Sequence, residues 1–368
     1  METVKLGVVG IGKMGEAHAQ SVFAGGVPGM ELAAVADTSP ERRDWARGFF
    51  PEGFPVFEDG GALFRSGLVQ AALVATPHYQ RPGLAIGAFG AGLHVMCEKP
   101  AGVYLGQVRE MNAAAEKSGK TFGIMFNQRT NSVYRKAREL AGSGRLGQIK
   151  RVSWIVTDWY RPQAYYDSGG WRATWAGEGG GVLINQCPHN LDLLQWICGM
   201  PQRVRAFCHN GKWHDIEVED DVTAYLEYPN GATGTFVTST ADAPGTNRLE
   251  ITLEKGRLLI EDGERITLDE LEVNERDFCK TAETGFERPA SKRSEPETDG
   301  GNEQHAGVLK AFAAAILHGG PLVADGREGE HSLALSNAMH LSSWLDKTVE
   351  LPIDDGLFLA ELDKRRRS

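Results

Sequence analysis

The 368-residue chain exceeds the usual size of a single hydrophobic core, so we expect two domains. Its hydrophobic residues (41%) and charged residues (24%) are typical of a globular protein, and the formal net charge of -10 argues against nucleic-acid binding. No apolar run approaches the ~20 residues of a membrane-spanning helix, so we expect no membrane association. The five cysteines form no C-x-x-C pair and are expected to be reduced. Because the N-terminus lacks signal-peptide features, we expect a cytoplasmic protein.

The first third of the chain alternates apolar, strand-like runs with amphipathic stretches. This alternation is typical of a doubly wound parallel sheet with helices on both faces. One stretch, Leu105–Lys117, has apolar residues near helical spacing and is followed by Gly119, a suitable helix stop. The expected strands are Val4–Val9, Glu31–Ala36, Val69–Ala75, His94–Cys97 and Thr121–Phe126.

A glycine-rich turn follows the first expected strand. The sequence Gly10-Ile11-Gly12-Lys13-Met14-Gly15 stands between a strand and a helical pattern, which is the context of the dinucleotide-binding fingerprint. Asp37 ends the second strand about 20 residues further on, where a carboxylate binds the adenosine ribose and repels a 2′-phosphate. We therefore expect NAD, although Arg42 and Arg43 leave NADP use open. The alternative is a cluster of turn glycines with a surface aspartate.

After residue 147 the pattern becomes richer in β-type segments separated by turn signals. Neighbouring strands are therefore expected to be antiparallel. Helical patterns cover residues 186–198, 304–317 and 329–347, and the polar stretch 281–302 is expected to be a long exposed loop. The expected strands are Gln148–Thr157, Arg203–Cys208, Thr223–Tyr228, Thr233–Thr240, Leu249–Leu253 and Arg257–Ile260.

Two further motifs, taken with the glycine turn, resemble the Gfo/Idh/MocA family of oxidoreductases. They are Glu98-Lys99-Pro100 and the segment 179–192, which joins three glycines to His189 and Asp192. The resemblance implies an α/β protein with an NAD-binding Rossmann domain at residues 1–128. It also implies a substrate-binding and oligomerisation α/β domain at residues 129–368, with a large, mostly antiparallel open sheet. The C-terminal helices of such a chain can pack back on the first domain, and we expect a homodimer or homotetramer.

Lys99 is the first expected catalytic residue. It follows a parallel strand, at the edge where open α/β sheets bind ligands, and its ammonium group can polarise or protonate a reacting oxygen. The family resemblance assigns Lys99 this catalytic role, with contacts to both cofactor and substrate. Thr76, Pro77 and Glu98 are further expected cofactor contacts. A cis peptide bond between Lys99 and Pro100 is consistent with this turn.

His189 is the second catalytic residue that the resemblance implies. A neutral imidazole can take the hydroxyl proton as an alcohol is oxidised. In a helix that begins near Asn185, residues Asn185, His189 and Asp192 share one face. Many family members carry aspartate where this chain has Asn185, so we assign Asn185 to orienting a substrate hydroxyl rather than relaying a proton. A capping or core histidine is the alternative.

Aromatic and arginine side chains precede the glycines of the second motif. Aromatic faces stack on sugar rings, and arginine and aspartate bind hydroxyl groups, although ordinary core packing explains such aromatics equally well. Arg161, Tyr165 and Arg172 are the preferred substrate contacts. The weaker candidates are His78, Asn127, Gln128 and Arg129.

The activity implied by these residues is hydride transfer between nicotinamide and a secondary alcohol or ketone carbon of a sugar, glycoside or inositol. Two alternatives stay open: a glycoside-processing enzyme that keeps its NAD bound, and a non-catalytic NAD- or sugar-binding regulator. No metal is expected. His209 and His214, with the acidic residues between 215 and 221, fit no metal template and are interpreted as a solvated acidic turn.

Overall fold

The computed structural model describes residues 2–367 and divides into two compact units. The first unit comprises the residues up to Thr130 together with Asn302–Leu333, and the second comprises Asn131–Gly301 together with the residues from Ala334 onward. This division differs from a single boundary at residue 128, because a segment from the C-terminal part of the chain belongs to the first unit. No helix within residues 2–367 is long and apolar enough to cross a membrane.

The first unit contains a six-stranded sheet of order β3-β2-β1-β4-β5-β6. Its strand pairs are parallel, and the order is that of doubly wound dinucleotide-binding folds. Its strands are buried over most of their length, which explains why they are apolar runs. The strands are β1 (Val4–Val9), β2 (Met30–Ala36), β3 (Val56–Phe57), β4 (Ala71–Val74), β5 (His94–Cys97) and β6 (Phe122–Ile124). The predicted parallel sheet is confirmed.

Helices flank this sheet. The helix predicted over 105–117 is confirmed as α5, and the left-handed backbone of Gly119 ends it. The α-helices are α1 (Lys13–Phe23), α2 (Pro40–Phe49), α3 (Gly60–Phe64), α4 (Arg81–Gly90), α5 (Leu105–Ser118) and α10 (Gln304–His318). Short 3-10 helices are η1 (His78–Gln80), η2 (Asn127–Thr130) and η3 (Gly326–Glu328).

Helix α10 completes the core of the first unit, although it lies far along the chain. Its Leu309 is 1% exposed and its Phe312 is fully buried, in one cluster with Leu6 and Val8 of β1. The helix predicted over 304–317 is thereby confirmed, and its apolar face has a partner in the parallel sheet. The first unit is consequently built from two segments of the chain.

The second unit contains a nine-stranded sheet of order β14-β13-β12-β11-β7-β10-β9-β8-β15. The predicted mostly antiparallel sheet is confirmed, but β7 and β10, which are not consecutive, run parallel. The strands are β7 (Ile149–Val156), β8 (Arg203–Asn210), β9 (Glu219–Glu227), β10 (Thr233–Ser239), β11 (Asn247–Leu253), β12 (Gly256–Glu261), β13 (Arg265–Leu271), β14 (Ser291–Ser294) and β15 (Val349–Glu350).

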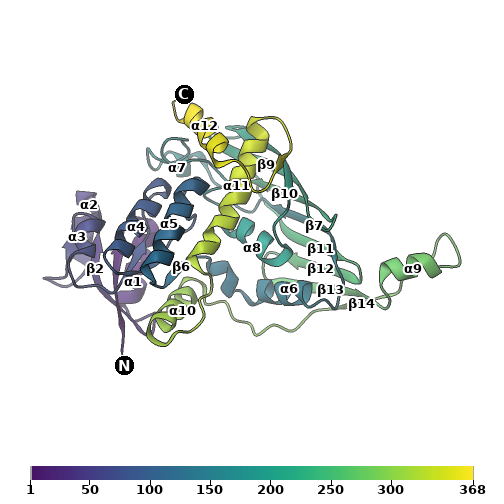
Figure 1. Ribbon diagram of the computed structural model, residues 1–368, viewed down its shortest axis with the longest axis horizontal. Coiled ribbons are helices and arrows are strands. Elements are labelled where there is room, and N and C mark those ends of the chain that lie inside the picture. Colours follow the sequence, from purple (N-terminus) through teal and green to yellow (C-terminus); the bar gives the residue numbers. More distant parts are fainter. Residues whose placement is uncertain (1, 368) are drawn as a thin grey trace. The chain divides into compact units, whose positions relative to one another are not determined.

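One face of this sheet packs against helices, among them α6 and α8 (Figure 1). Trp154 of β7 is fully buried there, with its ring centroid 6.3 Å from Tyr134 of α6 and 6.2 Å from Phe236 of β10. The neighbouring Ile155 points to the other face and is 43% exposed. The helices of this unit are α6 (Ser132–Gly142), α7 (Gln163–Tyr166), α8 (Pro188–Cys198), α9 (Glu275–Thr281) and α12 (Asp355–Arg366), while α11 (Gly329–Trp344) begins in the first unit.

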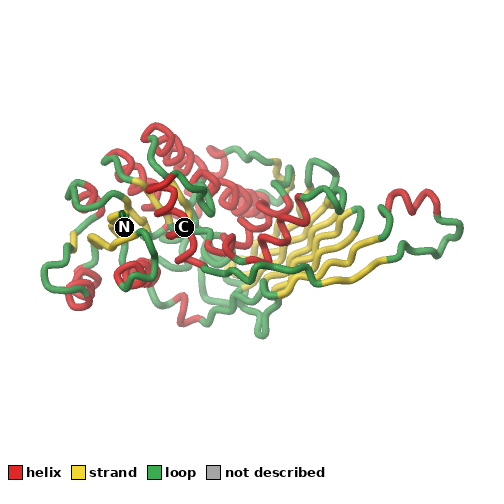
Figure 2. Tube along the Cα trace, turned by 90° about the horizontal axis from the view of Figure 1, so that it is seen from below, coloured by secondary structure: helices red, strands yellow, loops and turns green. Residues whose placement is uncertain are grey.

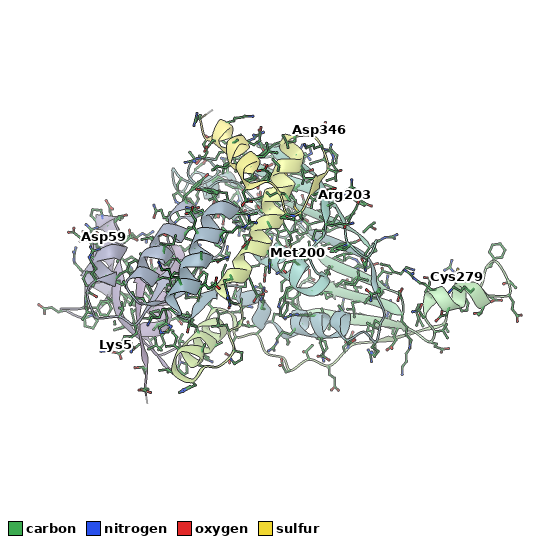
Figure 3. All side chains as sticks on the ribbon, in the orientation of Figure 1. Lys5, Asp59, Met200, Arg203, Cys279 and Asp346 are labelled. Carbon is green, nitrogen blue, oxygen red and sulfur yellow. The ribbon has the colours of Figure 1, made fainter. Side chains whose placement is uncertain are left out.

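The prediction of a long exposed loop at residues 281–302 is partly wrong. It contains β14, which pairs antiparallel with β13 at the sheet edge. All four β14 residues are exposed, so no apolar alternation marked this strand in the sequence. Just before it, α9 has no buried residue and projects beyond the sheet (Figure 2), and Figure 3 labels Cys279 on this projection.

Candidate active site

The carboxyl ends of four parallel strands lie in register in the first unit. Val9 of β1 pairs with Ala36 of β2 and with Val74 of β4, and Val74 pairs with Cys97 of β5. The segments that follow these strands therefore meet at one edge, on either side of the point where the strand order reverses. This edge brings together all the predicted cofactor residues: Gly10, Ile11, Gly12, Lys13, Met14, Gly15, Asp37, Thr76, Pro77, Glu98 and Lys99.

The glycine turn leads into α1 with little spare room on its inner side. Gly10 has a φ of +85°, and a Cβ on Gly15 would lie 1.8 Å from the Gly10 carbonyl oxygen, so both positions require glycine. Gly12 is different, because nothing lies within 4 Å of the place where its Cβ would be. This open space at the N-terminus of α1 suits a pyrophosphate, which the helix amides can bind.

Asp37 is tied directly to the glycine turn. Its Oδ2 accepts a hydrogen bond from the Ile11 amide at 2.8 Å, and its Oδ1 accepts one from the Ser39 amide at 2.8 Å. Each carboxylate oxygen keeps a further lone pair for a ribose hydroxyl. The carboxylate is therefore held beside the glycine turn.

The two arginines that left NADP use open are held by other groups in the first unit. Arg43 Nη1 donates to the Asp37 and Thr38 carbonyl oxygens, each at 2.9 Å. Arg42 pairs with Glu16 of α1 at 3.3 Å. Both guanidinium groups thus have partners close to Asp37.

A buried arginine that the sequence analysis missed joins two of the loops at this edge. Arg81 is 7% exposed; its Nε donates to the Thr76 carbonyl and its Nη1 to the Pro100 carbonyl, each at 2.8 Å. The peptide bond between Lys99 and Pro100 is cis. Arg81 therefore fixes the backbone on which Lys99 stands. No motif marks this residue, because its role depends on a contact between distant loops.

The Glu98 side chain points into the unit. Its Oε1 lies 2.7 Å from His18 Nε2, and its Oε2 accepts a hydrogen bond from the Lys99 amide at 3.1 Å. Burial by itself raises the pKa of Glu98. The His18 hydrogen bond and the positive charges of His18, Lys99 and Arg81 outweigh that effect and lower the pKa to about 2. Glu98 is thus an internal anion, and its contribution to the cofactor site is to hold the Lys99 turn.

His305 of α10 joins His18 and Glu98 in a cluster that the sequence analysis did not foresee. One donor atom of each residue lies within 4.8 Å of the others, and the two imidazole rings are 5.3 Å apart. Burial lowers the pKa of His305. Two histidines and a glutamate can ligate a divalent cation. In this structure the two carboxylate oxygens of Glu98 are hydrogen-bonded to His18 and to the Lys99 amide, so the cluster is tied to the Lys99 turn.

In the second unit, a buried carboxylate supports the glycine loop of the second motif. Glu219 is fully buried, and both its oxygens accept from the Gly181 amide at 2.9 Å while Oε1 also accepts from the Leu183 amide at 3.0 Å. A Cβ on Gly181 would lie 2.0 Å from the Glu219 carbonyl oxygen, so the close approach needs glycine. His340 Nε2 is 3.0 Å from Glu219 Oε2.

His189 lies in the first turn of α8, which begins at Pro188. Proline suits this position because the first helical amide has no intrahelical partner. The predicted start near Asn185 is wrong: the Cys187 amide donates to the Val182 carbonyl at 2.8 Å, so the preceding residues form a turn. Asn185 therefore does not share a helix face with His189.

Three predicted substrate residues of the second unit, Arg161, Arg172 and Asn185, gather around a fourth, Tyr165. Arg172 Nη1 donates to Tyr165 Oη at 2.9 Å, and Asn185 Nδ2 donates to the same oxygen at 3.2 Å. The Arg161 guanidinium lies 5.2 Å from the Tyr165 ring centroid and donates to the Tyr160 carbonyl. Tyrosine, arginine and asparagine side chains thus form one polar cluster.

A glutamate that the sequence analysis missed belongs to this cluster. Glu178 is 2% exposed; its Oε2 accepts from the Ala173 amide at 2.7 Å, and its Oε1 accepts from Asn185 Nδ2. Burial raises the pKa of Glu178 to about 7. Its position just before Gly179 was the only sequence signal. We call Tyr165, Arg172, Glu178 and Asn185 the Tyr165 cluster.

Comparison with known protein families decides what kind of chain this is. A family model described as the oxidoreductase family, NAD-binding Rossmann fold, matches residues 4–126. A second, described as the GFO/IDH/MocA C-terminal domain, matches residues 134–259. The chain belongs to the Gfo/Idh/MocA family of oxidoreductases. Its first unit is accordingly an NAD-binding Rossmann domain.

Three relatives illustrate the range of this family. The rhizopine catabolism protein MocA of Rhizobium meliloti is 29% identical over 199 residues, 54% of this chain and 58% of that protein. The 1,5-anhydro-D-fructose reductase of Ensifer adhaerens is 27% identical over 286 residues, 77% of this chain and 80% of that protein. The WlbA dehydrogenase from Bordetella pertussis, solved with NADH and UDP-GlcNAcA, is 28% identical, with a TM-score of 0.81 over 96% of this chain and 100% of that one. The matches span little more than half the length of the first curated relatives, 56% and 58%.

Among the weaker candidates of this Gfo/Idh/MocA chain, those in η2 have structural partners. Arg129 pairs with Glu328 at 2.8 Å, and Asn127 Nδ2 donates to Gln304. His78 is buried in η1. These contacts tie η2 to α10 and η3 within the first unit and explain why polar residues follow β6.

The interpretation of residues 209–221 as a solvated acidic turn is partly wrong: His209, Asp215 and Glu217 are exposed, but Glu219 and Asp220 are buried. Asp220 is fully buried and accepts hydrogen bonds from the amides of Lys212, Trp213 and His214. The His214 ring lies between Asp220, 2.9 Å from its Oδ2, and the Arg161 carbonyl at 2.8 Å. The acidic residues look exposed in sequence, but two of them turn inward to satisfy backbone amides of the loops around them.

Proposed function

We propose that this chain transfers hydride between NAD and a secondary alcohol or ketone carbon of a sugar, glycoside or inositol. Lys99 of the first unit and His189 of the second are its acid–base residues in this proposal. The observation that carries it is the dinucleotide edge of the first unit, where Lys99 follows β5 in register with the glycine turn and Asp37.

NAD accepts or supplies the hydride when it is bound at this edge. The α1 amides beside Gly12 would hold its pyrophosphate, and Asp37 would hold its ribose. The Lys99 ammonium then polarises the reacting oxygen, on a backbone that Arg81 and Glu98 fix. Because these groups are in place before any substrate arrives, their orientation costs little during the reaction.

The second unit supplies the groups that suit a polyhydroxylated substrate. The Tyr165 cluster combines an aromatic face with hydrogen-bonding groups, and His189 accepts the hydroxyl proton during oxidation. Two relatives point the same way: one is a reductase of an anhydrofructose, and another was solved with the sugar nucleotide UDP-GlcNAcA.

The test is a screen of myo-inositol, D-glucose and methyl α-D-glucoside with NAD, followed by the absorbance of reduced nicotinamide. We expect at least one polyol to reduce NAD at a rate that Lys99→Ala abolishes. An enzyme that keeps its NAD bound would instead cleave the glycoside while the amount of reduced nicotinamide never exceeds the amount of enzyme. No reduction and no cleavage with any polyol would overturn the proposal and favour the regulator.

We also infer a homo-oligomer formed through the open face of the nine-stranded sheet. Its exposed side chains include Ile155 (43%), Phe207 (49%) and Tyr225 (43%), on three strands whose alternate residues are buried. Burying such a surface stabilises association. Light scattering after gel filtration tests this, and an Ile155→Lys variant should shift the mass toward the monomer.

A further inference from the structure

Glu178 is a buried acid that the proposed acid–base pair does not use. It is 2% exposed, yet its carboxylate faces two donors: the Ala173 amide at 2.7 Å and the Asn185 side-chain amide. A buried carboxyl group is costly unless it is hydrogen-bonded, so this position calls for an explanation beyond packing. The Asn185 contact supplies one, because Asn185 is expected to meet the substrate.

The partners of Asn185 fix which way its amide points. Its Nδ2 donates to Glu178 Oε1 and also to Tyr165 Oη at 3.2 Å. A carboxylate can only accept hydrogen bonds, so the nitrogen of the amide must face Glu178. An amide whose two N–H groups are used in this way can meet a further group only through its oxygen, which is an acceptor.

Arg172 completes the arrangement. Its Nη1 donates to Tyr165 Oη at 2.9 Å, and its guanidinium lies 4.7 Å from the ring centroids of Tyr165 and Trp171. The same positive charge acts favourably on the Glu178 carboxylate. The cluster therefore runs from a cation, through a phenol, to an amide and a carboxylate.

We propose that Glu178 is a positioning residue of the substrate site, which holds the Asn185 amide so that it presents a hydrogen-bond acceptor to a substrate hydroxyl. This inference rests on the proposed function and adds a selectivity to it. The site favours a polyol with a hydroxyl donor at this position over its deoxy or O-methyl counterpart, neither of which can donate.

The arrangement also makes substrate binding depend on pH. Burial raises the pKa of Glu178 to about 7, and the nearby Glu219 raises it further, while the Ala173 amide, Arg172 and Asn185 lower it. Above that pH the carboxylate fixes the amide. Below it the protonated acid can donate to the Asn185 oxygen, and the amide can turn its nitrogen toward the substrate. The KM of a hydroxyl substrate should therefore rise as the pH falls through about 7.

Exchanging the two side chains tests this directly. In Glu178→Gln the oxygen stays on the fixed Ala173 amide, so the new NH2 group faces Asn185 and inverts it. We expect KM to rise about tenfold with a smaller change in kcat, because one hydrogen bond to the substrate is lost. Asn185→Asp keeps an acceptor toward the substrate but places two carboxyl groups in contact, so one of them must hold a proton and the step in KM should move to higher pH. The double variant E178Q/N185D restores a donor facing an acceptor and should recover most of the wild-type KM.

Controls separate this role from a general structural one. Glu217→Gln changes an exposed glutamate that accepts from the Trp175 amide, and it should leave KM unchanged. The pH-dependent step in KM should disappear in Glu178→Gln. A wild-type KM in Glu178→Gln, or a folded double variant without recovery, would overturn the proposal.

A measurement without substrate distinguishes its failure from failure of the proposed function. The unfolding midpoints of wild type, both single variants and the double variant form a cycle that reports the contact alone. Above pH 7, the unfolding midpoint of Asn185→Asp should be lower than that of the wild type, and the midpoint of the double variant should return toward the wild-type value. Additive effects would show that the pair does not interact and would refute the proposal, even if the polyol screen finds no substrate.

Discussion

Asp37 is the residue on which the choice between NAD and NADP most directly depends. Its two oxygens accept the Ile11 and Ser39 amides, so the charge is held beside the glycine turn. We predict tighter binding of NAD than of NADP, because a carboxylate repels a 2′-phosphate. Asp37→Ala should reduce the ratio of the NADPH and NADH dissociation constants, which fluorescence titration of both reduced cofactors measures.

The matched control is Asp37→Asn, which removes the charge but keeps a side chain of the same shape with an acceptor for one of the two backbone amides. If repulsion is the cause, Asn should relieve it nearly as well as Ala. A wild-type protein that prefers NADP would show that Arg42 or Arg43 leaves its present partner to bind the phosphate.

Lys99 and His189 stand on separate units, and neither is placed to hold the dinucleotide phosphates. We predict that Lys99→Ala and His189→Ala each lower kcat by ~10²–10⁴-fold, the usual contribution of an acid–base group, while NAD binding survives. Turnover of an active polyol and NADH titration measure the two effects. Lys117→Ala, on the exposed side of α5, should change neither. Near-normal turnover in either test variant would remove that residue from the mechanism.

Residues whose role is local could be predicted, and residues whose role depends on distant contacts could not. Asp37 stands at a fixed interval from the glycine turn, and its place follows from strand and turn alone. Arg81 and Glu178 carry no spacing signal, because their partners are carbonyls and amides of other loops. Asn185 drew attention because the family resemblance implies an aspartate at this position, but its neighbouring carboxylate became visible only in three dimensions.

At the scale of the elements, burial decides what the sequence reveals. Five strands of the parallel sheet are largely buried and appear as apolar runs, so their places were predicted within about two residues. The short edge strand β3 is only partly buried and was missed. The β14 strand has no buried residue, and nothing distinguishes it from a loop. The start of α8 was misplaced because turns and helices share local spacing, and only Pro188 marks the true boundary.

The loop from Gly179 to Leu183 is held by hydrogen bonds to the buried carboxylate of Glu219. Glu219→Ala leaves the buried Gly181 and Leu183 amides without this acceptor. Since each unsatisfied buried group costs ~1–3 kcal/mol, we predict a loss of at least about 2 kcal/mol in the free energy of unfolding. Urea denaturation measures it.

Glu227 provides the comparison on the same strand. It pairs with Arg203 at 3.0 Å, with side chains 34% and 45% exposed, so Glu227→Ala should cost less than about 1 kcal/mol. Equal losses in the two variants would mean that the glycine loop rearranges to find other acceptors.

At the scale of the whole molecule, the chain leaves the first unit at Thr130 and re-enters it at Asn302. The Gln304 amide donates to Thr130 Oγ1 at 2.8 Å, so exit and return are adjacent. The length of the chain predicts two domains. It does not predict that α10 returns to the first of them, because the apolar face of this helix could pack against either sheet. Only packing against Leu6 and Val8 decides its partner.

We predict that residues 2–130 alone do not form a cooperatively folded domain, because the fragment lacks Leu309 and Phe312. A protein in which a short Gly/Ser linker joins residues 2–130 to residues 302–333 should unfold in one sharp thermal transition and should bind NADH. Calorimetry and fluorescence titration check this. Equal melting and equal affinity of the two fragments would show that α10 is dispensable.

The same return sets an order of events during synthesis. The ribosome makes β1 to β6 early, but α10 emerges only after almost the whole second sheet has been translated. At ordinary elongation rates the nascent chain spends on the order of 10 s or more with one face of its nucleotide-binding sheet uncovered. Folding of the N-terminal domain must therefore await the C-terminal half, and a stalled or truncated polypeptide would expose the Leu6 and Val8 surface to chaperones and proteases.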